Sequence, residues 1–139
     1  MMSGPTPETR RTVLGRDGWK CAICGREIDW RWSGYSIHHR LKRSQGHGYT
    51  GLHQAGNLLP LCGSGSDGCH GWVHDQAGEA AYQLGYLVHP WQNPTATPVY
   101  YPRHGWQQLD DDGRRQPAQP PEGMPDYIPD IKHPEGTQE

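Results

Sequence analysis

The chain has 139 residues, of which 32% are hydrophobic and none is Phe, so it is the size of one domain with a small core. No apolar run reaches the length of a membrane span, and the opening residues MMSGPTPETRR lack the apolar stretch of a signal peptide, so we expect a soluble cytoplasmic protein. Residues 1–50 carry nine Lys and Arg against four Asp and Glu, a net charge of +5, whereas residues 51–139 have a net charge of −7. The basic half suits a polyanionic partner, but a solvated basic face explains it equally well.

The first half of the chain contains one predicted helix and two predicted strands. Thr6 followed by a proline and a glutamate is a typical helix start, so PETRRTVLGRD is predicted to form a helix that ends near Gly18. CAICG is predicted to form a tight turn, and Tyr35 to His39 a short strand. After a Gly-rich loop over residues 44–56, NLLPLC resumes an extended path.

The second half is predicted to begin with a helix and to end in a disordered tail. CHGWVHDQAGEAAYQL is predicted to form one helix, capped by Ser66 or Asp67. The segments PVYYP and GWQQL suit a hairpin. Six prolines and few aliphatic side chains indicate that residues 113–139 are disordered. We therefore expect one domain over residues 6–112, with its central motifs between residues 21 and 84.

The four cysteines occur as two pairs, Cys21 with Cys24 and Cys62 with Cys69. A Cys-x-x-Cys turn lets two thiolates reach one tetrahedral ion, and a distant second pair can close the site. The loop GSGSDG within the second pair is longer than the usual spacing of about two to four residues, but its glycines make it pliable. Two disulfides are the alternative, which the absence of a secretion signal disfavours. A structural zinc ion would contribute on the order of 10 kcal/mol to folding and would leave no position open for chemistry.

Two pairs of histidines suggest a second metal site and a catalytic base. His38 and His39 are adjacent on the predicted strand, where neighbouring side chains point to opposite faces, so we expect the two residues to have different roles. His70 and His74 are one helical turn apart, which places both imidazoles on the helix face where they can bind one ion. Taken alone, such a helical pair is more often an ordinary surface feature.

The order of these motifs resembles that of the HNH endonucleases. Cys-x-x-Cys, HHR, GNLLPLC and CH follow one another between Arg10 and Leu84, which is about half of the chain. The resemblance implies an α+β fold with a ββα-metal unit, clipped by a four-cysteine structural zinc, between an N-terminal helix and the Pro-rich tail. It also implies one catalytic divalent ion, which could be Mg²⁺, Mn²⁺, Ni²⁺ or Zn²⁺. The chain is most similar to the small HNH proteins of phages and actinobacteria.

The resemblance further implies roles for individual residues. His39 corresponds to the general base, and Asn57 matches the middle asparagine that holds the active-site loop and the base in place. The basic run after the predicted strand is expected to bind the flanking phosphates, with an ordinary polar loop as the alternative. His47 and His53, in the Gly-rich loop, are given no role. The remaining expected site residues are the ion ligands His38, His70 and His74 and the DNA-binding residues Arg40, Lys42 and Arg43.

We therefore expect a metal-dependent DNA endonuclease that leaves a 5′ phosphate and a 3′ hydroxyl. Its relatives serve in phage DNA packaging, beside terminase or portal proteins in the host cytoplasm, and in restriction. A zinc-ribbon module that only binds nucleic acid would need the cysteines and the basic run but not the histidines. A structural protein with two tightly bound zinc ions would show no cleavage.

Overall fold

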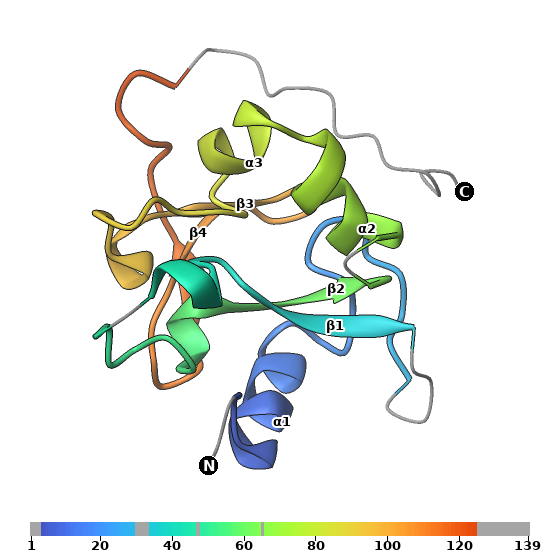
Figure 1. Cartoon of the computed structure of the whole chain (residues 1–139). Helices are drawn as coiled ribbons and strands as arrows, with labels where there is room; N and C mark the ends of the chain where they lie inside the picture. Colours follow the sequence, from blue (N-terminus) through green and yellow to red (C-terminus); the bar gives the residue numbers. More distant parts are fainter. Residues whose placement is uncertain (1–3, 30–33, 47, 65, 125–139) are drawn as a thin grey trace.

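The first element of the chain is the predicted N-terminal helix. The computed structural model describes residues 4–29, 34–46, 48–64 and 66–124 (Figure 1). Helix α1, Pro7–Arg16, begins where the capping pattern predicts. The Thr6 hydroxyl oxygen accepts a hydrogen bond from the main-chain N–H of Thr9 at 3.1 Å, and a proline occupies the first turn. The helix ends before Gly18, whose φ angle of 69° a residue with a side chain rarely adopts.

Two strands form the antiparallel pair at the centre of the molecule (Figure 1). Strand β1, Tyr35–His39, pairs with strand β2, Leu58–Cys62, so both predicted strands are confirmed. Every residue of β2 is buried, as expected for a strand covered on both faces. The Gly-rich segment between them contains two short 3₁₀ turns, η1 (Arg43–Gln45) and η2 (Ala55–Asn57).

The region after β2 contains three short helical segments. They are α2 (Gly68–Gly71), the π-helical turn η3 (Trp72–Gln76) and α3 (Glu79–Gln83). The prediction of one uninterrupted helix is wrong at Gly78, where a φ angle of 58° and a ψ angle of −133° lie outside the helical region. Because α2 continues directly into η3, the two histidines of this region still lie on one helical stretch.

A second sheet lies beside the first pair. Strands β3 (Val99–Tyr101) and β4 (Gly105–Leu109) form the predicted hairpin. Strand β5 (Arg115–Pro117) pairs with β4, so the disordered tail was predicted to start too early at residue 113. The composition of this segment is misleading because strand addition uses main-chain groups and needs few aliphatic side chains. Residues 125–139, which belong to the same prediction, lie outside the described residues.

The main core lies between β2, the helical segments that follow it and the second sheet. Leu59 and Leu61 of β2 meet Trp72 of η3 and Leu109 of β4 in this cluster, which also includes the buried cysteines. A smaller cluster joins α1 to β1 and β2. None of the described helices is long and apolar enough to cross a membrane.

A buried carboxylate ties α1 to both sheets. Asp17 accepts hydrogen bonds from the Arg16 guanidinium at 3.0 and 2.8 Å, and its two oxygens lie 3.0 and 2.9 Å from the Tyr101 hydroxyl of β3. Arg16 also donates to the carbonyl of Leu58 at 2.8 Å. Arg115 of β5 lies 3.3 Å from the same carboxylate. One buried ion-pair network therefore fixes the position of α1, β2, β3 and β5.

Candidate functional site

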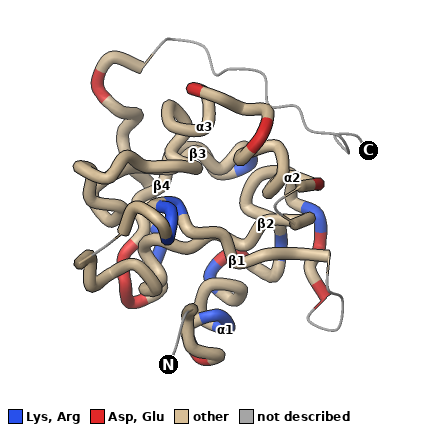
Figure 2. Tube along the Cα trace, in the orientation of Figure 1, with Lys and Arg blue, Asp and Glu red and all other residues tan. Residues whose placement is uncertain are grey.

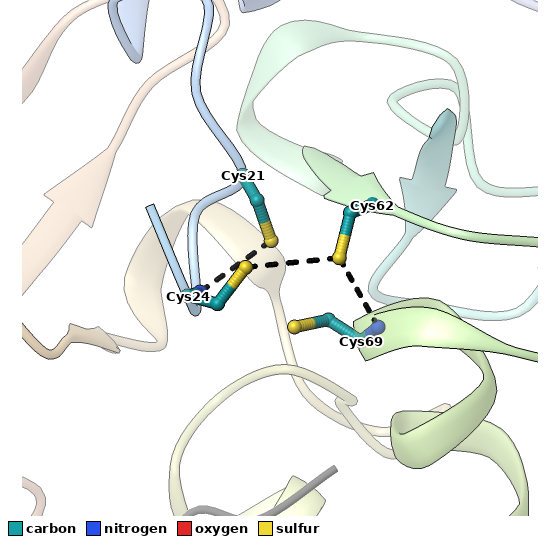
Figure 3. Close-up of side chains that lie close together, drawn as sticks. All are labelled: Cys21, Cys24, Cys62 and Cys69. Carbon is teal, nitrogen blue, oxygen red and sulfur yellow. Dashed lines mark hydrogen bonds between the residues drawn. The ribbon is translucent and has the colours of Figure 1, made fainter. Parts of the chain in front are cut away.

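The two cysteine pairs meet at one point in the structure (Figure 3). All four sulfur atoms lie within 4.8 Å of one another, and the Sγ atoms of Cys24 and Cys62 are 3.7 Å apart. A tetrahedral zinc ion with Zn–S distances of about 2.3 Å holds its sulfurs about 3.8 Å apart. Cys21 and Cys69 complete the set, and all four cysteines are free, so the structure does not contain the two alternative disulfides. The cluster fits a structural metal ion.

Short-range main-chain geometry builds this cysteine site. The N–H groups of Cys24 and Cys69 lie 3.5 and 3.4 Å from the Sγ atoms of Cys21 and Cys62, where they stabilise negative charge on sulfur. Gly68 has a φ angle of 64°, and a Cβ atom there would lie 2.6 Å from the carbonyl oxygen of Cys62. A glycine at this position therefore allows the long loop to return its second cysteine to the site.

The thiols of this site influence one another's ionisation. Hydrogen bonding with the Cys21 thiol lowers the pKa of Cys24 and lowers the pKa of Cys62 to about 6. Burial raises the pKa of Cys21 itself. A divalent cation would favour the thiolate form of every ligand, because only deprotonated sulfur binds it. With four sulfur ligands, such an ion has no open position for a substrate.

Three histidines from different elements form a second group of potential metal ligands. His38 lies in β1, His70 in α2 and His74 in η3, and one ring nitrogen of each lies within 4.8 Å of the other two. The Nε2 atoms of His70 and His74 are 3.0 Å apart. The fold therefore brings together the three residues that the sequence predicts as ligands of the catalytic ion.

The hydrogen bond of His38 leaves one ring nitrogen suited to bind a metal. Its Nε2 atom lies 2.7 Å from the carbonyl oxygen of Tyr86, which can only accept, so Nε2 carries the proton and Nδ1 a lone pair. The buried Nδ1 atoms of His38 and His70 have no hydrogen-bond partner in the described part of the chain. Burial holds the pKa of His38 well below its usual value and lowers the pKa of His70 to about 4. Both rings are therefore neutral at pH 7, which is the form that binds metals.

His39 makes a contact that the sequence does not predict. Its Nε2 atom lies 2.9 Å from Nδ1 of His53, a residue of the Gly-rich loop that was given no role. The two residues are 14 positions apart in the sequence, so no spacing rule could have paired them. Burial, followed by the positive charges that His53 and Arg43 can carry, lowers the pKa of His39 to about 4. His47, the other histidine of this loop, lies outside the described residues.

Asn57 holds two chain segments together from within the core. The side chain is fully buried. Its Oδ1 atom accepts from the N–H of Leu41 at 2.7 Å, and its Nδ2 atom lies 2.9 Å from the carbonyl of Leu52 and 3.3 Å from that of Leu41. Leu41 is two residues beyond His39, and Leu52 immediately precedes His53. These contacts join the segment that follows His39 to the loop that carries His53.

Arg40 was predicted to bind DNA, and the structure contradicts this. The residue is 0% exposed, because it lies on the same inward side of the chain as His38. Burial lowers its pKa to about 10. Its guanidinium donates hydrogen bonds of 2.7 to 3.1 Å to the main-chain carbonyls of Gly56, Gly85, Pro94 and Thr97. Arg40 therefore supports the fold and has no surface to offer a phosphate.

A cleft of about 590 Å³ joins the histidine cluster to basic residues. Arg10 reaches it from α1, and Lys42 and Arg43 reach it from the segment after β1; both segments carry blue residues in Figure 2. Arg10 was not among the predicted site residues, and only the net positive charge of the first 50 residues could have indicated it. The histidines that line the cleft with them are His38, His39, His70 and His74.

No family model, no curated protein and no solved structure matches this chain. Its function is therefore inferred from the two ligand clusters, the His39 contact and the charge of the cleft.

Proposed function

We propose that this protein is a metal-dependent DNA endonuclease of the HNH type. One observation carries the proposal: a three-histidine ligand cluster, a neighbouring neutral histidine and basic side chains from two elements line the same cleft. Phosphodiester hydrolysis needs these three kinds of group, since a water must lose a proton, charge must be stabilised on the phosphate, and the strand must be held.

The side chains of the cleft divide this work. His39, with its pKa lowered to about 4, is uncharged at neutral pH and can accept the proton of a water molecule in the cleft. His38, His70 and His74 would hold the ion, which when bound supplies positive charge for the phosphate and the departing 3′ oxygen. Arg10, Lys42 and Arg43 are positioned to bind the phosphates on either side.

The buried Nδ1 atom of His38 favours a nuclease over a zinc-ribbon module that only binds nucleic acid. A binding module requires the cysteine site and an accessible basic surface. It has no use for a fully buried imidazole that packs against two further imidazoles and keeps one nitrogen without a partner among the described residues. The products expected of the proposed reaction are a 5′ phosphate and a 3′ hydroxyl.

A plasmid-nicking assay with Mg²⁺, Mn²⁺, Ni²⁺ or Zn²⁺ tests the proposal. The parent should nick with at least one ion, and His39→Ala should lose about 10²- to 10⁴-fold in rate because the general base is removed. His104→Ala is the control, since His104 is exposed in the turn between β3 and β4 and does not line the cleft.

Two results would contradict the proposal. DNA binding without nicking by any ion would identify a nucleic-acid-binding module, and two tightly bound zinc ions without cleavage would identify a structural protein. Nicking by His39→Ala at the parental rate would leave a nuclease whose base is another residue.

A further inference from the structure

His39, which lines the cleft, forms a hydrogen bond with His53, and the proposed reaction so far gives His53 no role. We propose that His53 is a positioning residue, which fixes the ring orientation and the tautomer of His39; this inference rests on the proposed nuclease function. The contact joins Nε2 of His39 to Nδ1 of His53 at 2.9 Å, with the ring planes inclined at 79°. At this distance one of the two nitrogens donates a hydrogen bond to the other.

The position of that proton determines whether His39 can be a base. If Nε2 of His39 donates, its Nδ1 atom carries a lone pair and can accept a proton from water. If Nδ1 of His53 donates instead, neutral His39 must carry its proton on Nδ1 and cannot serve as the base through either nitrogen. A base at position 39 therefore requires His53 to accept through Nδ1 and to carry its own proton on Nε2.

The fold holds both members of the pair in place. Asn57 binds the main chain of Leu41 and Leu52, which are close in sequence to His39 and His53 respectively. The loop is also closed on itself, since the N–H of Gln54 donates to the carbonyl of Gly51 at 3.0 Å. The buried Asn57 side chain therefore holds together the two chain segments that carry His39 and His53.

The pair also accounts for where the charge goes when His39 becomes protonated. The proton taken from water resides on Nδ1 of His39, and the Nε2 proton continues to be shared with His53. His53 contributes an acceptor without a full negative charge, so His39 is oriented but not made strongly basic.

Two nearly isosteric substitutions separate positioning from packing. His53→Asn keeps an acceptor oxygen at the place of Nδ1, whereas His53→Leu fills a similar volume without an acceptor. We expect His53→Leu to lower kcat by about 10- to 100-fold at unchanged KM, and His53→Asn to recover most of that loss. Melting curves and zinc content should be the same in both variants. Parental kcat in His53→Leu, or no recovery in His53→Asn, would overturn the inference.

Nitrogen NMR of the imidazole rings gives a readout that does not depend on cleavage. In the full-length parent, His39 should be protonated on Nε2 and His53 on Nε2, and His53→Leu should shift His39 towards a mixture of tautomers. His39 protonated on Nδ1 in the parent would refute the positioning role. If the parent does not nick DNA but shows the expected tautomers, the nuclease proposal fails while the assigned geometry stands.

Discussion

The Nε2–H group of His38 in β1 donates a hydrogen bond to the main-chain carbonyl of Tyr86, 48 residues further along the chain, at 2.7 Å. The contact connects the first strand pair to the segment that follows α3. It also fixes the imidazole against the rings of His70 and His74, whose centroids lie 5.1 and 5.3 Å from its own, with Nδ1 shielded from solvent. A side chain held in this way would be oriented before any ion bound.

Replacing His38 should remove the second ion and leave the first in place. His38→Ala takes away one of three imidazole ligands, so we expect the affinity for Ni²⁺ or Co²⁺ to fall by more than about 100-fold. Calorimetric titration of zinc-loaded protein measures this. His104→Ala should bind as the parent does, and a variant that keeps both parental affinity and one zinc per chain would show that His38 is not a ligand.

Cys21→Ser should unfold the domain. Cys21 is 0% exposed and belongs to the main core as well as to the sulfur cluster. Structural zinc contributes on the order of 10 kcal/mol, which is comparable to the whole stability of a small domain. The cooperative melting transition should be lost, and a strong chelator should have the same effect on the parent. An unchanged transition with a full equivalent of zinc would contradict the structural role.

Replacing Arg40 should reduce stability, whereas replacing Lys42 should reduce DNA binding, although both residues belong to the same basic run. Arg40→Met leaves four buried carbonyls without their donor, so we expect a loss of unfolding free energy on the order of 3 to 5 kcal/mol. Lys42→Gln should keep the parental melting temperature, weaken DNA binding and lower the salt dependence of affinity by about one phosphate contact. Chemical denaturation measures the stability of both variants, and DNA-binding titrations at several salt concentrations measure their affinity. Equal stability of the two variants would contradict the prediction.

Arg115 should stabilise the fold, whereas its neighbour Arg114 should not. Arg115 contacts the buried Asp17 carboxylate and lies over the Tyr101 ring at 4.6 Å, so Arg115→Gln should cost about 1 to 2 kcal/mol. The Arg114 side chain is 75% exposed, and its ion pairs are worth about 0 to 1 kcal/mol. Equal melting temperatures for Arg115→Gln and Arg114→Gln would contradict this difference.

Truncation after residue 112 tests whether strand β5 contributes to the stability of the fold. It removes β5 together with Arg115, so the shortened protein should be less stable than the parent. The reason is the loss of main-chain pairing along β4 and of one contact to Asp17. Thermal melting of the zinc-loaded form is the measurement, and an unchanged transition would restore the view that this segment is not part of the fold.

Features that depend on neighbouring residues could be predicted without the structure. The Thr6 cap, the strand at Tyr35–His39 and the hairpin after Pro98 follow from local preferences. The pairs Cys21 with Cys24 and His70 with His74 follow from spacing, because residues three or four apart in a turn or helix are close together. Such signals need no knowledge of the rest of the chain.

The burial of individual side chains and the contacts between distant ones became known from the fold. Arg40 and Lys42 look alike in the sequence, yet one is enclosed by four carbonyls and the other lines a cleft. His53 forms a hydrogen bond with His39 because the buried Asn57 joins the two segments that carry these histidines. Arg115 reaches Asp17 across 98 residues. Burial and long-range contact depend on how all the elements pack around one core, and no local pattern of residues encodes that packing.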